Sequence, residues 1–168
     1  MLKQKVEIAL NNQVKEEFES SQIYLAMASW AESNGFGGAA NFFYAHSEEE
    51  RMHGMKMIHY INDRGGNAII SELPKPEFKY NNVQEIFESA FQHEQYISEK
   101  INELVGICRN ESDYSTENFM QWYVQEQVEE ESLFSDLLDK LELLGDHKGK
   151  MFLFDNELAK ASAAHSAE

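Results

Sequence analysis

Residues 65–82 read GGNAIISELPKPEFKYNN, and this stretch decides how the elements on its two sides are connected. It opens with two glycines and holds both prolines of the chain, so it predicts an irregular segment rather than a helix. About 18 residues in extended form can reach ~59 Å, whereas a helix of about 28 residues is ~42 Å long. The segment can therefore run the whole length of a helix, so that the helices before and after it point in the same direction.

Long helices are predicted on both sides of this crossover segment. They cover about 3–33 and 39–64 before it, about 83–110 and 117–144 after it, and a short fifth helix covers about 149–162. Gly65 and Gly66 form a helix stop, and Asn82 with Glu85 is a capping-box signature. The breaks at 34–38 and 111–116 are short, which makes the helices that they join antiparallel neighbours. The predicted fold is all-α: one domain over 1–168, with a four-helix bundle at about 3–144.

Charge and composition limit the classes of function. Asp and Glu number 30 against 14 Lys and Arg, a net charge of −16, which argues against nucleic acid and anionic membranes as partners. There is no apolar run of transmembrane length, and the N-terminal MLKQKVEIALNNQ lacks the apolar core of a signal peptide. Cys108 is the single cysteine, so no intrachain disulfide can form. We expect a cytoplasmic protein whose small partners are cations.

Each long helix carries an apolar stripe with spacings of three and four, and acid interrupts each stripe near its middle. The stripes are Val6, Leu10, Gln13, Glu17, Ser21, Tyr24 and Ala28; Phe43, His46, Glu50, His53, Met57 and Ile61; Val83, Phe87, Ala90, Glu94, Ile97, Ile101, Leu104 and Cys108; and Phe119, Tyr123, Glu126, Glu130, Leu133, Leu137, Leu141 and Leu144. Because the helices have similar lengths, their middles share one layer of the bundle. The acids predicted to meet in that layer are Glu17, Glu50, Glu94 and Glu130.

The negative charge of such a layer must be compensated from elsewhere, because no Lys or Arg lies on the stripes. The acids either take up protons or bind metal, and divalent cations would neutralise them directly. His53 follows Glu50 by three positions and projects from the same helical face. Glu-x-x-His with single Glu residues from other helices is the ligand pattern of dinuclear carboxylate sites in bundles. Mostly oxygen ligands with one imidazole favour iron(II) or manganese.

Further side chains flank this layer. Glu49, Glu126 and Glu129 could form a second acidic lobe, or Glu49 and Glu129 could be a solvated flank. Tyr24 lies two turns past Glu17 and is either a plain core tyrosine or, near the metals, a hydrogen-bond partner or one-electron donor. Trp122 is expected to line one side of the site. The histidines expected to have ordinary core or surface roles are His46, His59, His93 and His147.

The chain resembles bacterial non-haem ferritins over essentially all 168 residues. The segments that carry the resemblance are NQVKEEFESSQIYLAMASW (12–30), HSEEERMHGMK (46–56), HEQYIS (93–98) and NFMQWYVQEQVEEE (118–131). It implies a ferritin-like bundle whose ferroxidase centre has one iron held by Glu17, Glu50 and His53. A second iron would be held by Glu50, Glu94 and Glu130, with Glu50 bridging.

The resemblance implies more about this site. Gln127 matches a glutamine that hydrogen-bonds in the pocket, and Tyr24 matches the family tyrosine beside the centre. A third iron site, typical of prokaryotic members, maps onto Glu49, Glu126, Glu129 and Glu130. Haem is not expected, because Arg51 follows Glu50 where bacterioferritins carry the haem-binding methionine, and Met52 is offset by one position.

The resemblance also implies a hollow shell of 24 subunits, with the fifth helix at the four-fold axes. Iron(II) would be oxidised there by dioxygen or hydrogen peroxide and stored as a ferric oxyhydroxide mineral. Two other hypotheses remain at this point. A dinuclear-iron oxidase or peroxidase acting on an organic substrate would be a monomer or dimer. A metal-free acidic bundle would serve as an interaction module.

Overall fold

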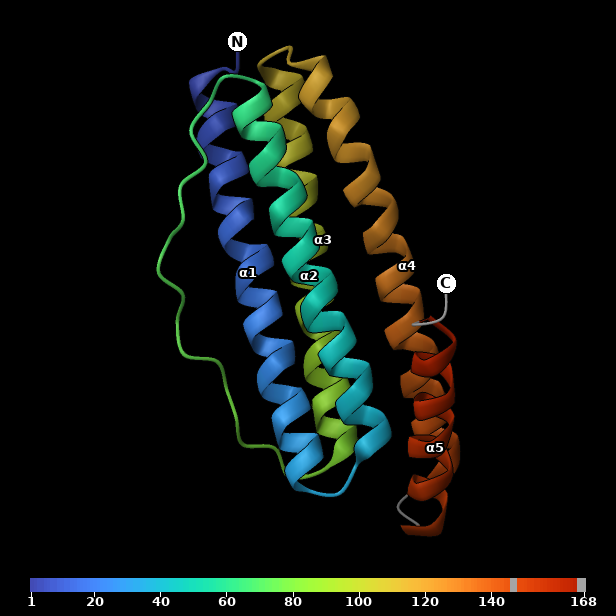
Figure 1. Cartoon of the computed structure of the whole chain (residues 1–168). Coiled ribbons are helices and arrows are strands. Elements are labelled where there is room, and N and C mark those ends of the chain that lie inside the picture. Colours follow the sequence, from blue (N-terminus) through green and yellow to red (C-terminus); the bar gives the residue numbers. More distant parts are fainter. Residues whose placement is uncertain (146–147, 166–168) are drawn as a thin grey trace.

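The computed structural model describes residues 1–145 and 148–165, and side chains at 1–145 and 149–160. The helices are α1 (Gln4–Ser33), α2 (Gly37–Asp63), α3 (Val83–Asn110), α4 (Tyr114–Leu144) and α5 (Lys148–His165). The first four run along one long axis, and α5 turns back beside the end of α4 (Figure 1). The all-α four-helix bundle with a short C-terminal helix is therefore confirmed.

The crossover segment runs along α1 from the end of α2 to the start of α3, so α2 and α3 point the same way (Figure 1). Two side chains of α1 hold its beginning. The Asn11 amide donates to the Asn67 carbonyl at 3.1 Å and accepts from the Ile69 N–H at 2.6 Å. The Glu7 carboxylate accepts from the Asn67 N–H at 2.8 Å. The predicted long crossover between α2 and α3 is therefore confirmed.

Local sequence signals explain most helix ends. Asn82 accepts from the Glu85 N–H at 2.9 Å, and the Glu85 carboxylate reaches back to the Asn81 N–H at 2.6 Å. This capping arrangement fixes the start of α3 at the predicted residue. Gly65 ends α2 with a φ of 76°, in the left-handed region that glycine occupies without strain.

The start of α4 differs from the prediction by three residues, since the helix begins at Tyr114 rather than about Glu117. Asp113 caps it by accepting from the Thr116 N–H at 3.2 Å. The preceding residue, Ser112, takes a φ of 55° and ends α3 without a glycine. The whole turn is therefore shorter than the segment 111–116. The other ends also differ slightly, because α2 begins at Gly37 and α5 spans Lys148–His165.

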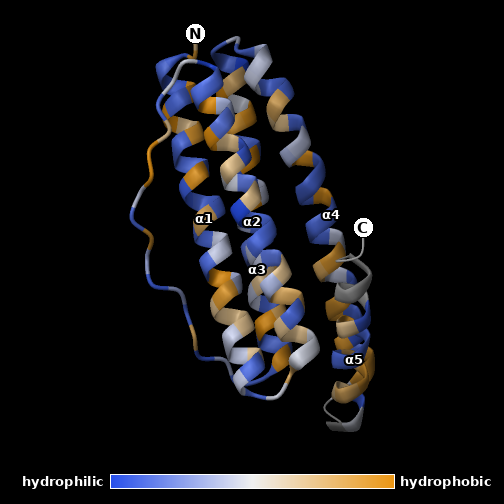
Figure 2. Ribbon diagram, viewed as in Figure 1, coloured by the Kyte–Doolittle hydropathy of each residue, from blue (hydrophilic) through white to orange (hydrophobic). Residues whose placement is uncertain are grey.

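The apolar core is split into two clusters by a polar layer, and every long helix mixes hydrophobic and hydrophilic residues (Figure 2). One cluster includes Tyr24, Met27, Phe43, Phe87, Phe134 and Phe154. The other includes Val6, Leu10, Met57, Ile97, Ile101 and Tyr123. Acidic side chains therefore lie between two hydrophobic ends of the same bundle. None of the described helices has the length and apolar character needed to cross a membrane.

The predicted stripes of the first three helices are buried throughout, but the stripe of α4 is not. Leu133 is 38% exposed, whereas its neighbour Phe134 is fully buried. The residues of α4 that do face the core are Thr116, Met120, Tyr123, Gln127, Glu130, Phe134, Leu137 and Leu141. These buried positions also alternate by three and four, so the predicted spacing was right and its register was wrong: Phe119, Glu126 and Leu133 each lie one position before the buried residue.

Helix α5 is joined to the start of α2 by a partly buried cap. The Asp155 carboxylate accepts from the N–H groups of Gly38 and Ala39, at 3.0 and 2.8 Å. A methyl group on Gly38 would lie 1.7 Å from the Asp155 carbonyl oxygen. Only glycine allows this approach. Phe154 and Leu158 add apolar contacts to the cluster that contains Phe87.

Candidate metal centre

Four glutamates, one from each long helix, are buried in the polar layer between the two apolar clusters. They are Glu17, Glu50, Glu94 and Glu130. Their burial follows from the interrupted stripes, which force the middle of every helix inward with its neighbours. The structure thus brings together the four acids that the sequence predicted to meet.

Glu17, Glu50 and His53 form a compact group whose potential ligand atoms all lie within 4.8 Å of one another. The His53 Nδ1 is 3.5 Å from the Glu50 Oε2 and 3.7 Å from the Glu17 Oε2. Gln13 donates to the other oxygen of Glu17 at 2.8 Å, which holds the carboxylate in this orientation. Both His53 distances are longer than an ordinary hydrogen bond, so a cation fits between these facing ligand atoms.

Glu94 is held by donors on both of its oxygens. The Tyr24 hydroxyl donates to Oε1, and the Gln127 amide donates to Oε2 at 2.8 Å. These contacts bring Tyr24 and Gln127 to the buried layer where the sequence placed them. Each oxygen still has a free lone pair, so either can accept a further ligand.

Two carboxylate oxygens in this layer have no hydrogen-bond partner among the described residues. They are the Oε2 atoms of Glu50 and Glu130, and both are buried. A buried carboxylate oxygen without a donor is unstable unless a proton or a cation compensates it. The pair therefore indicates where positive charge is missing.

The electrostatics of the metal-free site agree with this geometry. Burial, followed by the nearby Glu50 charge, raises the pKa of Glu17 well above its ordinary value. Burial and the Glu94 charge do the same to the pKa of Glu50. Burial raises the pKa of Glu94 to about 7, although the hydrogen bonds from Tyr24 and Gln127 oppose the rise. Without metal, these carboxyls tend to hold protons.

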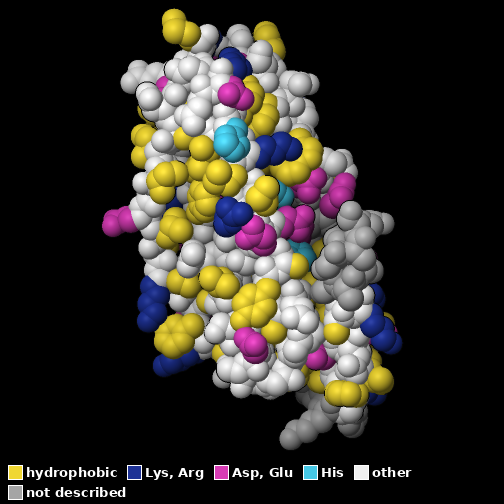
Figure 3. Space-filling model, viewed as in Figure 1, with side chains coloured by type: hydrophobic (Ala, Val, Ile, Leu, Met, Phe, Trp, Pro, Cys, Tyr) yellow, Lys and Arg dark blue, Asp and Glu magenta, His cyan; other side chains and the backbone are white. Residues whose placement is uncertain are grey.

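A second acidic lobe lies beside this core at the surface between α2 and α4, where acidic side chains gather beside histidine (Figure 3). Glu49 and Glu126 share a group with His53, with potential ligand atoms within 4.8 Å. Glu49 is exposed and Glu126 is half-buried. Glu129 is not brought into the group, because it is exposed and accepts from the Gln125 amide at 2.8 Å.

His46 lies at this site, although the sequence suggested an ordinary role. Its Nδ1 is 3.0 Å from the Phe42 carbonyl, which fixes the ring and leaves Nε2 toward Glu130 at 3.5 Å. Together with Glu49, these residues form a further potential ligand group. Burial lowers the pKa of His46, but the nearby negative charge of Glu130 outweighs burial, so the pKa is raised overall. Its position one turn before Glu50 was the available signal.

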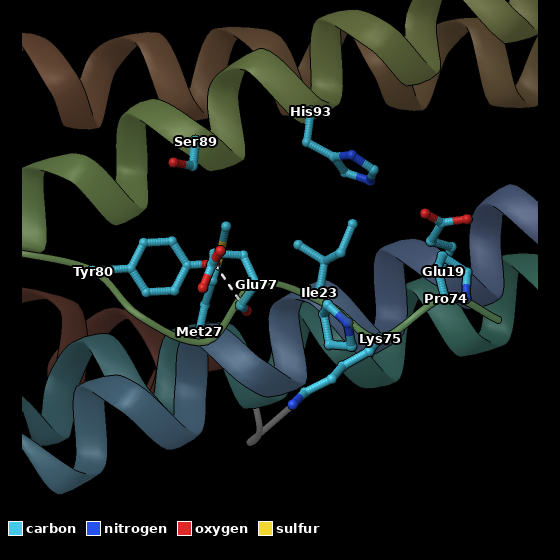
Figure 4. Close-up of a pocket in the computed structure, with 10 residues that line it drawn as sticks. Glu19, Ile23, Met27, Pro74, Lys75, Glu77, Tyr80, Ser89 and His93 are labelled. Carbon is cyan, nitrogen blue, oxygen red and sulfur yellow. Dashed lines mark hydrogen bonds between the residues drawn. The ribbon is translucent and has the colours of Figure 1, made fainter.

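The remaining histidines lie elsewhere. His93 is next to Glu94 in sequence but borders a different pocket, of about 330 Å³, between α1, α3 and the crossover segment (Figure 4). Its Nε2 is 2.8 Å from the Ser20 hydroxyl, and burial lowers the pKa of His93 to about 4. It is therefore a neutral core histidine at pH 7. His59 is exposed, and His147 is outside the described residues.

The donor set of the layer is mostly carboxylate oxygen with imidazole nitrogen. Such ligands suit iron(II) and manganese(II), whereas thiolate-rich sets suit zinc and copper(I). The single cysteine, Cys108, is buried in one of the apolar clusters, and burial raises the pKa of its thiol to about 11. The site can therefore hold hard divalent cations and stabilise a rise in their charge.

A family model described as a ferritin-like domain matches residues 7–144. A Haemophilus influenzae relative, a "Probable bacterial non-heme ferritin-like protein", is 45% identical over 162 residues, 96% of this chain and 98% of its own length. A bacterial non-heme ferritin of Campylobacter jejuni is 40% identical over 155 residues, covering 92% and 93%. An open pore ferritin from Archaeoglobus fulgidus superposes with a TM-score of 0.93 at 37% identity, covering 95% and 98%.

Proposed function

The chain belongs to the ferritin family, and we propose that it is an iron-storage protein that oxidises iron(II) at the buried carboxylate layer. The observation that carries the proposal is the pair of buried, unpartnered Oε2 atoms on Glu50 and Glu130. They lie in a layer of acids from all four long helices that only added positive charge can compensate. Iron is the substrate of this reaction and the material that is stored.

Two adjacent positions would receive iron(II). Glu17, Glu50 and His53 supply one, and their existing separation within 4.8 Å supports it. Glu50, Glu94 and Glu130 supply the other, so that Glu50 bridges the two ions. Gln13, Gln127 and Tyr24 would orient the carboxylates through the hydrogen bonds described above.

A third iron position would use Glu49, Glu126, Glu129 and Glu130, with His46 as an additional nitrogen donor. The contacts that support it are the ligand groups of Glu49 with His53 and Glu126, and of Glu49 with His46 and Glu130. Glu129 would join only after its side chain leaves Gln125. This site is closer to solvent than the other two, which suits transfer of iron away from the centre.

The chemistry is a two-electron oxidation. Two iron(II) ions each give one electron to dioxygen, which takes up two protons and leaves as hydrogen peroxide. The peroxide can in turn oxidise further iron(II). Carboxylates favour the product, because iron(III) is a harder cation that prefers oxygen ligands.

Storage requires an assembly. In our proposal, 24 copies form a hollow cytoplasmic shell around a ferric oxyhydroxide mineral, with α5 at the four-fold axes and without haem. The likeness to an open pore ferritin supports a shell of this class. The net charge of −16 is compatible with a protein that concentrates cations.

Ligand variants test the proposal. Glu17→Ala and Glu130→Ala should each slow aerobic iron(II) oxidation by at least about tenfold in stopped-flow absorbance, because each removes a ligand of one iron position. Glu48→Ala is the matched control, since Glu48 is exposed and pairs only with Arg51. Native mass should remain that of the shell in all three. Unchanged oxidation kinetics in both ligand variants would refute the assigned centre.

A further inference from the structure

Three oxidisable aromatic rings border the candidate metal centre. The Tyr24 hydroxyl donates a hydrogen bond to the Glu94 carboxylate. The Tyr123 hydroxyl donates to the His53 carbonyl at 2.8 Å, and its ring centre is 6.2 Å from that of His53. Trp122 stands edge-on to the His53 ring, with ring centres 5.1 Å apart. Each ring is close enough to the metal ligands to lose an electron to chemistry that occurs there.

The two tyrosines differ in where their protons could go. A phenol that loses an electron becomes a strong acid, so a nearby base that accepts its proton makes the oxidation easier. Tyr24 has such a base in the Glu94 carboxylate. Tyr123 faces a peptide carbonyl, which accepts a hydrogen bond but is too weak a base to take the proton. Tyr24 thus has a carboxylate as its hydrogen-bond acceptor, whereas Tyr123 has only a peptide carbonyl.

Trp122 is set apart by a cation on its face. The Lys56 Nζ lies 3.0 Å from the centre of the Trp122 ring and 5.9 Å from that of Tyr123. An ammonium is attracted by the electrons of a neutral indole. Removing one electron turns that attraction into repulsion between two positive charges at short range. Lys56 therefore makes the indole harder to oxidise.

We propose that Lys56 shields Trp122 from one-electron oxidation by the iron chemistry of the centre. This inference rests on the proposed function for its source of oxidant. In the balanced step, one iron(II) and one side chain each give an electron to hydrogen peroxide. The iron becomes iron(III), the side chain loses its electron and proton to become a neutral radical, and a second proton from solvent completes two waters.

Protection of Trp122 matters because oxidation of this ring could spread to a residue that supports a metal ligand. Trp122 and Tyr123 are in contact, with ring centres 4.8 Å apart, so a radical on either ring could pass to the other. Tyr123 holds the backbone of the metal ligand His53. Oxidative damage to Trp122 or Tyr123 would therefore disturb the position of the ligand His53. Lys56 lies one turn after His53 on α2, close to both rings, and therefore protects both.

The test compares Lys56→Met, which keeps the length but removes the charge, with Lys56→Arg, which keeps the charge. Both are made in a Trp30→Phe background, since the chain has two tryptophans and Trp122 is then the only one. In the first assay, metal-free protein is oxidised by flash-quench with tris(bipyridine)ruthenium(III), and the tryptophan radical yield is read by absorbance. In the second, limited iron(II) and hydrogen peroxide are added, and oxygenated Trp122 is measured by peptide mass mapping.

Lys56→Met should raise Trp122 oxidation about fivefold in both assays, and Lys56→Arg should match the parent. Lys56→Gln gives a second neutral variant, and the melting temperature shows that each variant is folded. Equal radical yields in the neutral variants and the parent in the metal-free assay would overturn the proposal. Failure of the parent to oxidise iron would count against the proposed function, while the metal-free assay would still decide the role of Lys56.

Discussion

Glu50 lies close to His53 and within the electrostatic influence of Glu94 and Glu130. Its Oε2 lies 3.5 Å from His53 and has no hydrogen-bond partner among the described residues. Burial and the charge of Glu94 raise its pKa well above the ordinary value. A residue in this state is stable in one of two ways, with a proton or with a metal, and the two are in competition.

This competition predicts a pH dependence for the metal-free protein. The raised pKa values of Glu17, Glu50 and Glu94 mean that the folded protein binds more protons than the unfolded chain, whose glutamates titrate near about 4.3. As the pH rises above that value, and through the Glu94 pKa of about 7, these groups lower the free energy of unfolding. Glu17→Gln should therefore melt higher than the parent at pH 8 and near the parent at pH 5.

Calorimetry of chelator-treated protein at both pH values measures this effect. Gln13 can still donate to the remaining carbonyl oxygen of the new side chain, so the local hydrogen bond is kept. A parent protein that melts higher than the variant at pH 8 would contradict the assigned burial of the Glu17 charge.

A second prediction concerns the side chain of Gln13. Its amide orients Glu17, so Gln13→Leu should slow iron(II) oxidation by about tenfold without removing a ligand. The neighbouring Asn12 is exposed, and Asn12→Leu is the matched control. Stopped-flow absorbance compares the two. Equal rates in Gln13→Leu and its control would show that the hydrogen bond has no role in the reaction.

The sequence predicted the buried acids because mid-helix glutamates on apolar stripes have few other places to lie. It did not predict the roles of Gln13 and His46, although both were on the stripes. Those roles depend on which oxygen or nitrogen each side chain presents, as with the Phe42 carbonyl that orients His46. Rotamers and hydrogen-bond partners are set by packing, which spacing alone does not give.

At the scale of elements, capping residues set the accuracy of the predicted helix ends. Helix α3 begins at the predicted residue because Asn82 and Glu85 are an unambiguous signal. The start of α4 was wrong because Ser112, rather than glycine, takes the left-handed conformation. The stripe of α4 also slipped, which placed Leu133 in the core instead of Phe134.

The junction of α2 and α5 predicts a selective effect of two adjacent glycines. Gly38→Ala should displace α5, because the new methyl group would lie 1.7 Å from the Asp155 carbonyl oxygen. We expect a loss of about 1 to 3 kcal/mol in the free energy of unfolding. Gly37→Ala is the control, since no atom lies within 4 Å of its added methyl group. Thermal melts and limited proteolysis of α5 measure both. Equal protection of α5 in the two variants would contradict the close packing.

For the whole molecule, two apolar clusters provide the stability that the acidic layer between them weakens. The crossover topology could be predicted from chain length, because only a long irregular segment can return along a helix. The shell could not be derived from one chain's periodicity, since it depends on surfaces that meet other copies. Its support is family membership.

Metal binding should therefore stabilise the folded molecule as a whole. Zinc(II), which has no redox chemistry, should raise the melting temperature of metal-free protein, with a gain of about 2.7 kcal/mol at 100 times its dissociation constant. A Glu17→Ala, Glu130→Ala double variant should lose most of that gain. Differential scanning calorimetry with and without zinc(II) measures it. A gain of the same size in the double variant would place the stabilising metal elsewhere.

The most direct measurement of the central claim is anomalous diffraction from crystals soaked anaerobically in ferrous salt. We expect two adjacent iron peaks inside the bundle, one against Glu17 and His53 and one against Glu94 and Glu130, with the Glu50 carboxylate between them. Iron peaks confined to the outer surface, with no density inside the layer of acids, would contradict it.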